Sequence, residues 1–593
     1  MTPPSNNDIF RTIHAEVVAA LRAQLPDLPE ELMARVLVEP PRDPAHGDMA
    51  TNAALVVAKP ARMAPQKVAQ ELAERLMARP GIVHAAPAGP GFVNLRLDES
   101  VLRDQVPAIL RAGTSYGDSA VGAGRKVDLE YVSANPTGPM HVGHCRGAVV
   151  GDALANLLVK AGYDVTKEYY VNDAGAQVQA LAWAAYWRYL QALGTTLTEE
   201  EYAATIPGGL QYRGEYLIPV GEALKARHGD ALAPNAHPAD PVLWLDTVRT
   251  FTVDAMMVEI REDLAALGVR QDVFISEAEL VRTGAADRAI ADLAARGLVY
   301  EGVLEPPKGK LPDDWEEREQ TLFRSTQFGD DVDRPLRKSD GSNTYFANDI
   351  GNHADKLHRG FDVLLQVWGA DHGGYVTRMK AAVAALSQDR PVPLEVILCQ
   401  IVKVMKGGQP VRMSKRAGTY VTLRDLIDEV GKDAVRFTML TRKSDAQMEF
   451  DLDAVVQQSR DNPVFYVQYA HARCRSVLRQ VEDPAPEVLA GAPLVSLTDP
   501  AEMALIRRLA AWPRTVEAAA AAREPHRIAF FLHDLAADFH LLWNRGREDA
   551  TLRFIREGEE DATRARLALV AATATVIRSG LGVMGVEPVE EMR

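Results

Sequence analysis

Short apolar runs alternate with helix-like segments through the middle of the chain. Four runs rich in β-branched and aromatic residues, VDLEYV, DVTKEYY, DVLLQVW and LEVILCQIV, begin at residues 127, 164, 362 and 394. Segments with helical spacing of apolar residues separate them. This alternation predicts an α/β fold whose strands form a parallel sheet joined by right-handed crossovers.

The two ends of the chain and one internal stretch have other patterns. Residues 1 to about 115 mix helix-like spacing with the strand-like run GFVNLRL, which predicts α+β structure. Residues 176 to 270 are mostly helical, and their aromatic helix LAWAAYWRYLQAL is interpreted as core, with an RNA-stacking surface as the alternative. Residues from about 461 to 593 are almost entirely helical in pattern. Their apolar stripe, which we expect to be core, consists of Phe531, Leu535, Phe539 and Leu542.

Length and composition describe an ordinary globular protein. A chain of 593 residues is too long for one core and suggests three or four domains. The scattered Cys145, Cys399 and Cys474 form no CxxC pair, which indicates a reducing compartment and no structural zinc. No segment approaches the roughly 20 apolar residues of a membrane helix, and the N-terminus lacks a signal pattern. We therefore expect a cytoplasmic protein without a membrane partner.

The net charge of −15 does not exclude an RNA partner. A specific RNA-binding protein needs only local cationic stripes on an acidic body. No lysine occurs after Lys443, so every fixed cation in the last 150 residues is arginine. Arginine can stack on bases and bind phosphates, but a GC-rich genome would give the same bias.

Candidate chemistry lies where the first strand-like run passes into a helix-like run. His141 and His144, three residues apart, should share one face of the first helical turn, beside backbone N–H groups that favour phosphate oxygens. Gly138 and Pro139 set a tight turn, and Gly143 leaves room for a ligand. A bare HxGH would be read as surface histidines, but this context favours nucleotide binding. The motif comprises Ala134, Asn135, Pro136, Thr137, Gly138, Pro139, Met140, His141, Val142, Gly143 and His144.

These residues resemble a known family. HVGH resembles the HIGH motif of class I aminoacyl-tRNA synthetases, and VRMSKRAG resembles their KMSKS motif, with Arg412 in place of the first lysine. With GFVNLRL, YYVNDAGAQ, TYFANDIGNH and VWGADHGGY, the chain resembles the arginyl-tRNA synthetase family over nearly its whole length. The resemblance implies a class I Rossmann-type catalytic domain with insertions, an α+β N-terminal domain and an all-α C-terminal domain.

The resemblance also implies a domain plan. Residues 1–115 would be an added domain that binds the tRNA elbow, and residues 116–405 the catalytic domain, with a helical insertion at about 176–270. Residues 406–460 would hold the MSK loop and a helical connector. Residues 461–593 would be a helical anticodon-binding domain.

The implied activity is ligation of L-arginine to tRNA(Arg). ATP and arginine would give arginyl-adenylate and pyrophosphate, and the 2′-hydroxyl of the terminal adenosine would then take the arginine and release AMP. Magnesium would arrive with ATP, no structural metal is expected, and the enzyme is expected to be a monomer. The rivals are a small-molecule nucleotidyltransferase, which would not need the helical C-terminal domain, and a noncatalytic tRNA-binding paralogue, which would lose the motifs.

Site residues follow from the motif match. Charge on the phosphates would be stabilised by His141, His144 and Lys415. ATP would be bound by Gly143, Gly369, Asp371, His372, Met413, Ser414 and Lys415. A planar guanidinium is best held bidentately by carboxylates, and the implied arginine site is Glu130, Asn135, Glu277, Tyr345 and Asp349. Unpaired tRNA bases could stack on a face of Tyr466, Tyr469 and Arg473, with burial against a neighbouring helix as the alternative.

Overall fold

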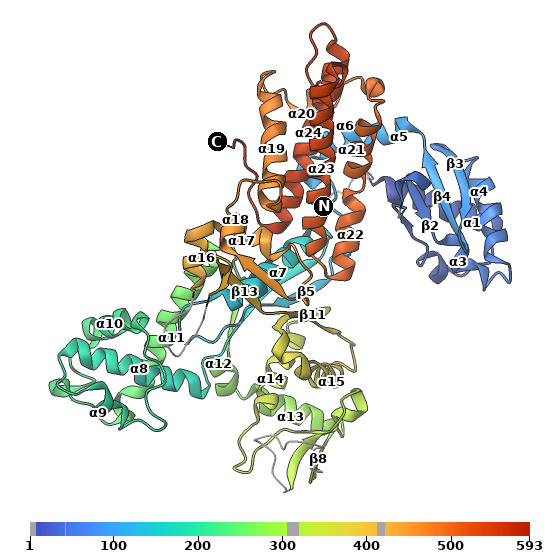
Figure 1. Cartoon of the computed structure of the whole chain (residues 1–593). Coiled ribbons are helices and arrows are strands. Elements are labelled where there is room, and N and C mark those ends of the chain that lie inside the picture. The colour runs from blue at the N-terminus through green and yellow to red at the C-terminus, as the bar shows by residue number, and fades with distance from the viewer. Residues whose placement is uncertain (1–7, 42, 305–318, 412–420, 593) are drawn as a thin grey trace. The chain divides into compact units, whose positions relative to one another are not determined.

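The computed structural model describes residues 8–41, 43–304, 319–411 and 421–592 (Figure 1). The chain divides into two compact units. One comprises Met1–Ala123, Asn156–Gly162 and Gln457–Arg593, and the other comprises Gly124–Ala155 and Tyr163–Val456. We describe each unit by itself.

The N-terminal part of the first unit is a four-stranded antiparallel sheet covered by helices, which confirms the predicted α+β structure. The strand order is β1-β2-β4-β3. The helix α1 begins where the Asp8 side chain accepts a hydrogen bond from the backbone N–H of Phe10. The elements are α1 (Ile9–Gln24), α2 (Glu30–Met33), β1 (Val38–Glu39), β2 (Met49–Thr51), α3 (Ala53–Ala58), α4 (Pro65–Leu76), β3 (Ile82–Ala88) and β4 (Phe92–Leu97).

The rest of this unit is helical. The apolar stripe on α23 is at most 6% exposed at each of its four positions, so its interpretation as core is confirmed. The helices are α5 (Glu99–Arg103), α6 (Gln105–Ala112), α19 (Pro463–Arg479), α20 (Pro486–Leu489), α21 (Pro500–Ala510), α22 (Trp512–Ala522), α23 (His526–Glu548) and α24 (Glu560–Met584).

One expectation about apolar segments was wrong. By length and composition, α24 is apolar enough to cross a membrane, with a mean hydropathy of 1.7 over its most apolar window. However, 83% of that window is buried inside the protein, and α24 packs against α19 and α23. Its small side chains, such as Ala568 and Ala572, allow that close packing. It is the core helix of the bundle.

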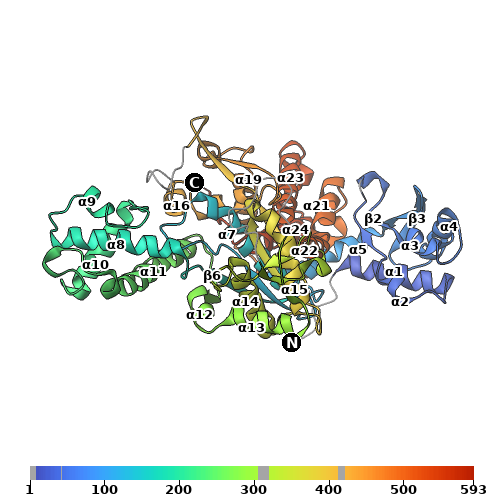
Figure 2. The ribbon, with the colours of Figure 1, turned by 90° about the horizontal axis from the view of Figure 1, so that it is seen from below.

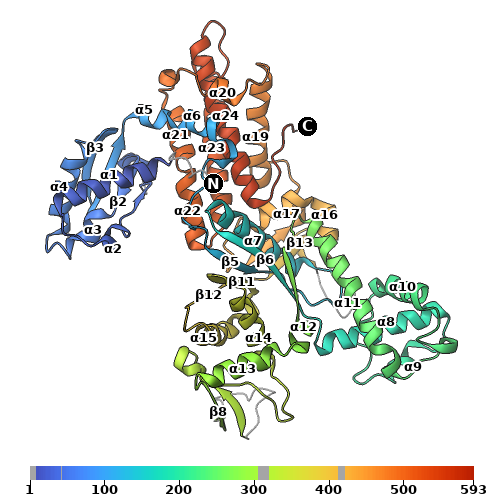
Figure 3. The same ribbon diagram turned by 180° about the vertical axis from the view of Figure 1, so that it is seen from behind.

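The second unit is built on a five-stranded parallel sheet in the order β12-β11-β5-β6-β7, which confirms the α/β class. The four predicted runs supply β5 (Lys126–Glu130), β6 (Asp164–Val171), β11 (Val363–Gly369) and β12 (Leu394–Cys399). From central β5 the chain builds first toward β6 and later toward β11 (Figure 3). In open sheets of this kind, ligands bind at the carboxyl ends of the strands where the order switches.

Two details of the sheet departed from the pattern. The edge strand β7 (Val273–Ser276) was not anticipated, because it has only four residues, all half-buried. The run LEVILCQIV is not continuous: β12 ends at Cys399, and β13 (Val402–Lys406) joins another small sheet. That sheet has the order β14-β13-β15, with β14 (Gln409–Pro410) and β15 (Met448–Asp451).

The insertion between β6 and β7 is a helical body with its own core. Tyr186 stacks on Trp244 with ring centroids 3.6 Å apart, and both side chains are almost fully buried. The aromatic helix is therefore core, as interpreted from the sequence. The helices are grouped in Figure 2: α8 (Ala176–Leu193), α9 (Glu199–Ala203), α10 (Ile218–His228) and α11 (Pro241–Ala266).

The other elements of this unit flank the sheet. The helix α7 (Val142–Lys160) follows β5, and its final residues belong to the first unit. The helix α13 packs along α14 (Figure 3). The remaining elements are α12 (Glu277–Arg282), α13 (Ala285–Ala295), β8 (Val299–Gly302), β9 (Gln320–Phe323), β10 (Arg334–Pro335), α14 (Tyr345–His358), α15 (Val376–Leu386), α16 (Leu423–Val430), α17 (Lys432–Met439) and α18 (Leu452–Val455).

Candidate active site

The two histidines of HVGH lie at the start of α7, as the spacing predicts. Their rings stack with centroids 3.9 Å apart, and the backbone N–H of Gly143 donates to Nδ1 of His141 at 3.0 Å. A Cβ on Gly143 would lie only 2.7 Å from Cε1 of His141. Glycine at this position therefore allows the His141 ring to fold back over the first turn of the helix.

The strand-to-helix connection is joined to a segment far along the chain. The backbone N–H of Leu423 donates to the carbonyl of Met140 at 2.8 Å, and His141 forms an isolated antiparallel bridge with Thr422. Residues 421–423 come a few positions after the string VRMSKRAG in the sequence. The predicted residues of that string, Arg412, Met413, Ser414 and Lys415, lie outside the described residues. The structure therefore brings the segment that comes after the second motif to the first motif.

The carboxylates of Glu130, Glu277 and Asp349, here called the acidic pocket, act on one another. Burial raises the pKa of Asp349 to about 7. The charges of Glu277 and Glu130 also raise this pKa, whereas the Tyr375 hydroxyl, which donates a hydrogen bond to Asp349, lowers it. Burial raises the pKa of Glu277 too, and the carboxylate of Asp173 adds to that rise. Negative charge is thus concentrated at these carboxylates, and a cationic ligand beside them would lower the repulsion between them.

The described contacts of Glu130 set its direction. It is only 8% exposed at the end of β5. Its Oε1 accepts from the hydroxyl of Ser133 at 3.0 Å, and its Oε2 accepts from the side-chain amide of Gln366 at 3.0 Å. Gln366 is the neighbour of Glu130 in the adjacent strand β11. The carboxylate is therefore held by the segment that follows β5 and by β11.

Two of the predicted arginine-site residues are not drawn into these contacts. Asn135 is exposed and donates to the side-chain carbonyl of Gln177 at 2.8 Å. Tyr345 begins α14 and is 69% exposed, with the ammonium of Lys338 5.3 Å from its ring centroid. The structure brings Glu130, Glu277 and Asp349 together and leaves these two at the surface.

The predicted nucleotide residues after β11 form an open turn. Residues 369–375, here called the GADHGGY turn, contain a short 3₁₀ helix (Ala370–Tyr375). The side chains of Asp371 and His372 are 75% and 64% exposed, with 3.6 Å between the nearest oxygen and nitrogen. A Cβ on Gly369 would lie 2.5 Å from Oδ1 of Asp371, so a side chain at this position would displace that exposed carboxylate. The turn presents polar groups at the carboxyl edge of the sheet.

The predicted RNA-binding residues form a partly buried cluster on α19, in the other unit. The Arg473 guanidinium lies 4.0 Å from the ring centroid of Tyr469 and 4.8 Å from that of Trp543. The ring of Tyr466 packs 4.6 Å from that of His540, whose pKa burial lowers to about 4. The cluster therefore packs against α23 and keeps one face partly exposed.

Several residues of the site were not found from the sequence. Asp173 accepts hydrogen bonds from the Ser276 hydroxyl at 2.6 Å and from the N–H of Ala278 at 2.7 Å, so it fixes the end of β7 beside Glu277. Tyr216 of the insertion donates to the carbonyl of Thr137 at 2.7 Å. Asp173 and Tyr375 stand in strings that carry the resemblance, and that position was the available signal. Nothing local marked Tyr216.

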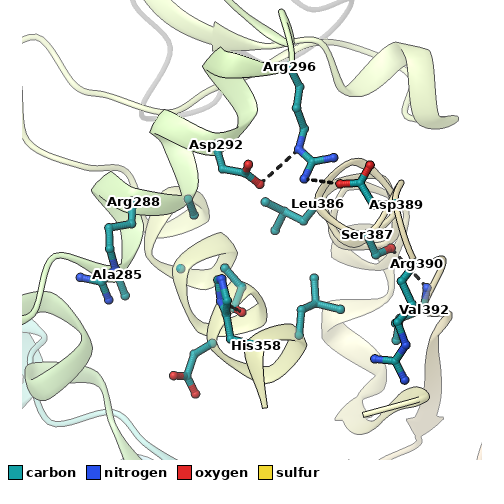
Figure 4. Close-up of a pocket in the computed structure, with 15 residues that line it drawn as sticks. Ala285, Arg288, Asp292, Arg296, His358, Leu386, Ser387, Asp389, Arg390 and Val392 are labelled. Atoms are coloured by element: carbon teal, nitrogen blue, oxygen red, sulfur yellow. Dashed lines mark hydrogen bonds and ion pairs between the residues drawn. The ribbon is translucent and has the colours of Figure 1, made fainter. Parts of the chain in front are cut away.

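The cavity shown in Figure 4 is not at this edge of the sheet. It has a volume of about 650 Å³, and its lining comes from α13, α14 and the segment between α15 and β12. Arg296 bridges Asp292 and Asp389 across it. None of the predicted site residues that the structure describes lines it. In the described part of the chain, no group of three or more His, Cys, Asp or Glu is placed to hold a metal ion.

Comparison with known proteins gives three family matches along the chain. Residues 11–97 match the "Arginyl tRNA synthetase N terminal domain". Residues 105–197 match "tRNA synthetases class I (R), catalytic domain", and residues 467–592 match the "DALR anticodon binding domain". The matches follow the order of the regions read from the sequence.

Relatives and solved structures agree with these matches. The arginine–tRNA ligase of Gluconobacter oxydans is 62% identical over 99% of this chain and 98% of its own length. That of Cereibacter sphaeroides is 58% identical over 99% and 100%. The structure of a putative arginyl-tRNA synthetase from Campylobacter jejuni is 30% identical, with a TM-score of 0.71 over 84% of this chain and 100% of that one. The Thermus thermophilus arginyl-tRNA synthetase shares the fold, with a TM-score of 0.71 at 21% identity over 98% and 100%.

Similarity of this degree along the whole chain confirms the resemblance seen in the motifs. The chain belongs to the arginyl-tRNA synthetases, the class I family that ligates arginine to tRNA in an ATP-dependent reaction.

Proposed function

We propose that this chain activates arginine with ATP at the carboxyl edge of its parallel sheet and then transfers the arginine to tRNA(Arg). One observation carries the proposal. The HVGH turn and residues 421–423 are hydrogen-bonded to each other, and the turn follows the strand that ends in Glu130 of the acidic pocket. Phosphate-binding groups and a site for a cationic amino acid thus meet at the sheet's switch point.

The acidic pocket is the proposed site for the arginine side chain. A guanidinium offers five N–H donors in a plane, which suits carboxylates whose mutual repulsion is relieved by a cation. Asp349 and Glu277 would receive it, with Glu130 beside them and the Tyr345 ring, one helical turn before Asp349, closing over the ligand. Asn135 would contact the α-amino or carboxylate end.

The proposed nucleotide site lies on the other side of the HVGH turn. Gly143, Gly369, Asp371 and His372 would contact ATP, with the ribose near the GADHGGY turn, and the loop residues Met413, Ser414 and Lys415 would contact the phosphates. His141, His144 and Lys415 would stabilise charge as the arginine carboxylate attacks the α-phosphorus and pyrophosphate leaves. Magnesium would be carried in by the triphosphate oxygens.

The second step transfers the arginine. The 2′-hydroxyl of the terminal adenosine would attack the adenylate carbonyl, forming the ester and releasing AMP. Tyr466, Tyr469 and Arg473 would contact unpaired anticodon bases by stacking, and residues 1–115 would contact the tRNA elbow. We further propose that the enzyme works as a monomer in the cytoplasm.

Pyrophosphate exchange tests the activity directly. The purified full-length chain is incubated with ATP and labelled pyrophosphate, with arginine or lysine, and with or without tRNA(Arg). We expect exchange with arginine, little with lysine, and more exchange when tRNA is present. Exchange that does not depend on the amino acid would contradict the proposal, as would failure to form arginyl-tRNA.

A further inference from the structure

A fully buried lysine lies beneath the acidic pocket. The side chain of Lys356, on α14, is 0% exposed, and its Nζ lies 2.7 Å from Oδ2 of Asp128, 2.9 Å from Oε2 of Glu130 and 2.5 Å from Oε1 of Glu168. Burial alone would lower the pKa of Lys356, but the three carboxylates outweigh it and raise the pKa. The ammonium is therefore charged. Lysine is almost never buried so completely without such partners.

Only one of the three carboxylates belongs to the acidic pocket. The side chains of Asp128 and Glu168 are 0% exposed, whereas that of Glu130 is 10% exposed. Glu168 has a second cationic partner, because the guanidinium of Arg359 lies 2.5 Å from its Oε2. Among the described contacts, Glu130 has the neutral donors Ser133 and Gln366 in addition to Lys356. Among the residues that the structure describes, Lys356 is thus the cation that contacts Glu130.

The fold explains why this lysine can reach Glu130. Asp128 and Glu130 alternate on β5 and so share one face of the sheet, and α14 packs against that face through Lys356. Asp349 stands seven residues before Lys356, two turns away on the same side of α14. The helix α14 therefore carries Asp349 of the acidic pocket and, two turns later, the ammonium of Lys356 that contacts Glu130.

A second connection runs through the same helix. Nδ1 of His353 lies 2.7 Å from the carbonyl of Asp349, and its Nε2 lies 3.3 Å from Oε1 of Gln366. Gln366 in turn donates to the same Oε2 of Glu130 that contacts Lys356. Two donors that depend on α14 thus converge on one oxygen of Glu130. The carboxylate plane is fixed, and Oε1 stays on the Ser133 side.

We propose that Lys356 is a positioning residue for the amino-acid site, which keeps the Glu130 carboxylate oriented toward a cationic substrate. The inference rests on the proposed assignment of Glu130 to the arginine site. The lysine does not touch the substrate. It supplies the positive charge that allows Asp128, Glu130 and Glu168 to lie near one another before arginine binds. Without it, Glu130 would lose both a charged hydrogen bond and its direction.

The test compares two cations of the same buried cluster in the full-length enzyme. Lys356→Met removes the ammonium with little change in length, and Arg359→Met removes a guanidinium that contacts Glu168 but has no described contact with Glu130. For Lys356→Met we expect the KM for arginine in pyrophosphate exchange to rise on the order of 10- to 100-fold, the loss of one charged hydrogen bond. The KM for ATP should stay within about twofold. Arg359→Met should leave the ratio of the two KM values unchanged.

Loss of folding is controlled separately. Thermal unfolding is measured for both variants, and Lys356→Gln, which keeps an N–H donor without the charge, replaces Lys356→Met if the latter does not fold. Lys356→Gln should give a smaller rise in the same KM. If a folded Lys356 variant lowers kcat and leaves the KM ratio at the value of the Arg359 variant, the lysine is structural only and the proposal is overturned.

Glu130→Gln separates this inference from its premise. A rise in the KM for arginine in Glu130→Gln, matched by the Lys356 variants, supports both the site assignment and the positioning role. A normal KM for arginine in Glu130→Gln removes Glu130 from the arginine site and overturns the premise. A raised KM in Glu130→Gln with a normal KM in Lys356→Met keeps the premise and overturns the role of Lys356.

Discussion

The acidic pocket and the GADHGGY turn lie at one edge of the same sheet but are built in opposite ways. In the pocket, Glu130 is 8% exposed and is held by Ser133, by Gln366 on β11 and by a buried lysine. In the turn, Asp371 and His372 are mostly exposed, and the carboxylate of Asp371 lies close to the Cα of Gly369. One region has fixed, costly buried charge, and the other has open polar groups.

The difference teaches how the two proposed ligands are told apart. Selecting arginine requires rejecting other amino acids, and buried polar groups that are left unpaired by the wrong ligand reject it strongly. A triphosphate, by contrast, can be bound by features that suit any phosphate, such as helix N-termini and cationic side chains. We therefore expect substitutions in the pocket to act on arginine and substitutions near HVGH to act on the chemistry of the phosphates.

The largest effect should come from Asp349→Asn. A neutral amide cannot accept the bidentate guanidinium fork, and loss of one partner of a buried charge pair costs about 3–5 kcal/mol. We expect kcat/KM for arginine to fall accordingly while the KM for ATP changes little. Steady-state pyrophosphate exchange measures both constants. Asp371→Asn is the matched control in the turn, and an equal rise of both KM values in Asp349→Asn would show that this residue is structural.

Lys415→Ala should affect the phosphate chemistry and not the arginine site. Lys415 matches the second lysine of KMSKS, and removal of one preorganised electrostatic contact costs about 2–4 kcal/mol of transition-state stabilisation. We expect slower adenylate formation with unchanged arginine binding. Single-turnover assays measure the first, and calorimetry measures the second. Lys403→Ala, an exposed lysine on β13, is the control; a wild-type rate for Lys415→Ala would remove this residue from the mechanism.

Gly143→Ala should give a smaller effect, confined to the phosphate side. The added Cβ would lie 2.7 Å from the His141 ring, so the ring has to move. We expect adenylate formation to slow by about 1–2 kcal/mol, typical of local overpacking. The helix itself should be as stable as before or more so, because alanine is the better helix former. Single-turnover rates and a thermal melt check this, and an unchanged rate would mean that the His141 position is unimportant.

The smallest effect should be the release of protons from Asp349 when arginine binds. The raised pKa of Asp349, about 7, means that the folded protein binds this proton more tightly than the unfolded chain. Its contribution to stability is therefore greatest below about pH 4 and is lost as the pH rises toward about 7. Arginine should displace the proton, on the order of half a proton at pH 7, and bind more tightly as the pH rises. Calorimetry in buffers of different ionisation enthalpy measures the release; a heat independent of buffer, or release unchanged in Asp349→Asn, would contradict it.

Local patterns predicted much of the fold and part of the site. Four strands and the start of α7 follow from apolar runs and turn residues, and the place of His141 and His144 follows from their spacing. The four-residue strand β7 was missed because a short run at a sheet edge has too little pattern to separate it from a loop. The break after Cys399 was missed because apolar residues continue across it.

Other features of the site depend on the tertiary structure. Lys356 lies on a helix whose sequence reads as half-exposed, and its partners Asp128 and Glu168 are about 230 and 190 residues away. A lysine is expected at the surface until its partners are seen. Tyr345 shows the reverse: the resemblance implies a place in the arginine site, but the side chain is exposed, with the ammonium of Lys338 5.3 Å from its ring centroid, so its role stays a prediction.

The bridge between His141 and Thr422 has a consequence for how the enzyme is made. The two residues are about 280 positions apart, and ribosomes add roughly 5–20 residues per second. The first motif is therefore synthesised roughly 15–55 s before the backbone that pairs with it leaves the ribosome. During that interval the carbonyl of Met140 and the N–H of Val142 must bond to water or to temporary partners. A nascent chain could build its first strands early, but it could not complete this edge of the sheet until the second motif had emerged.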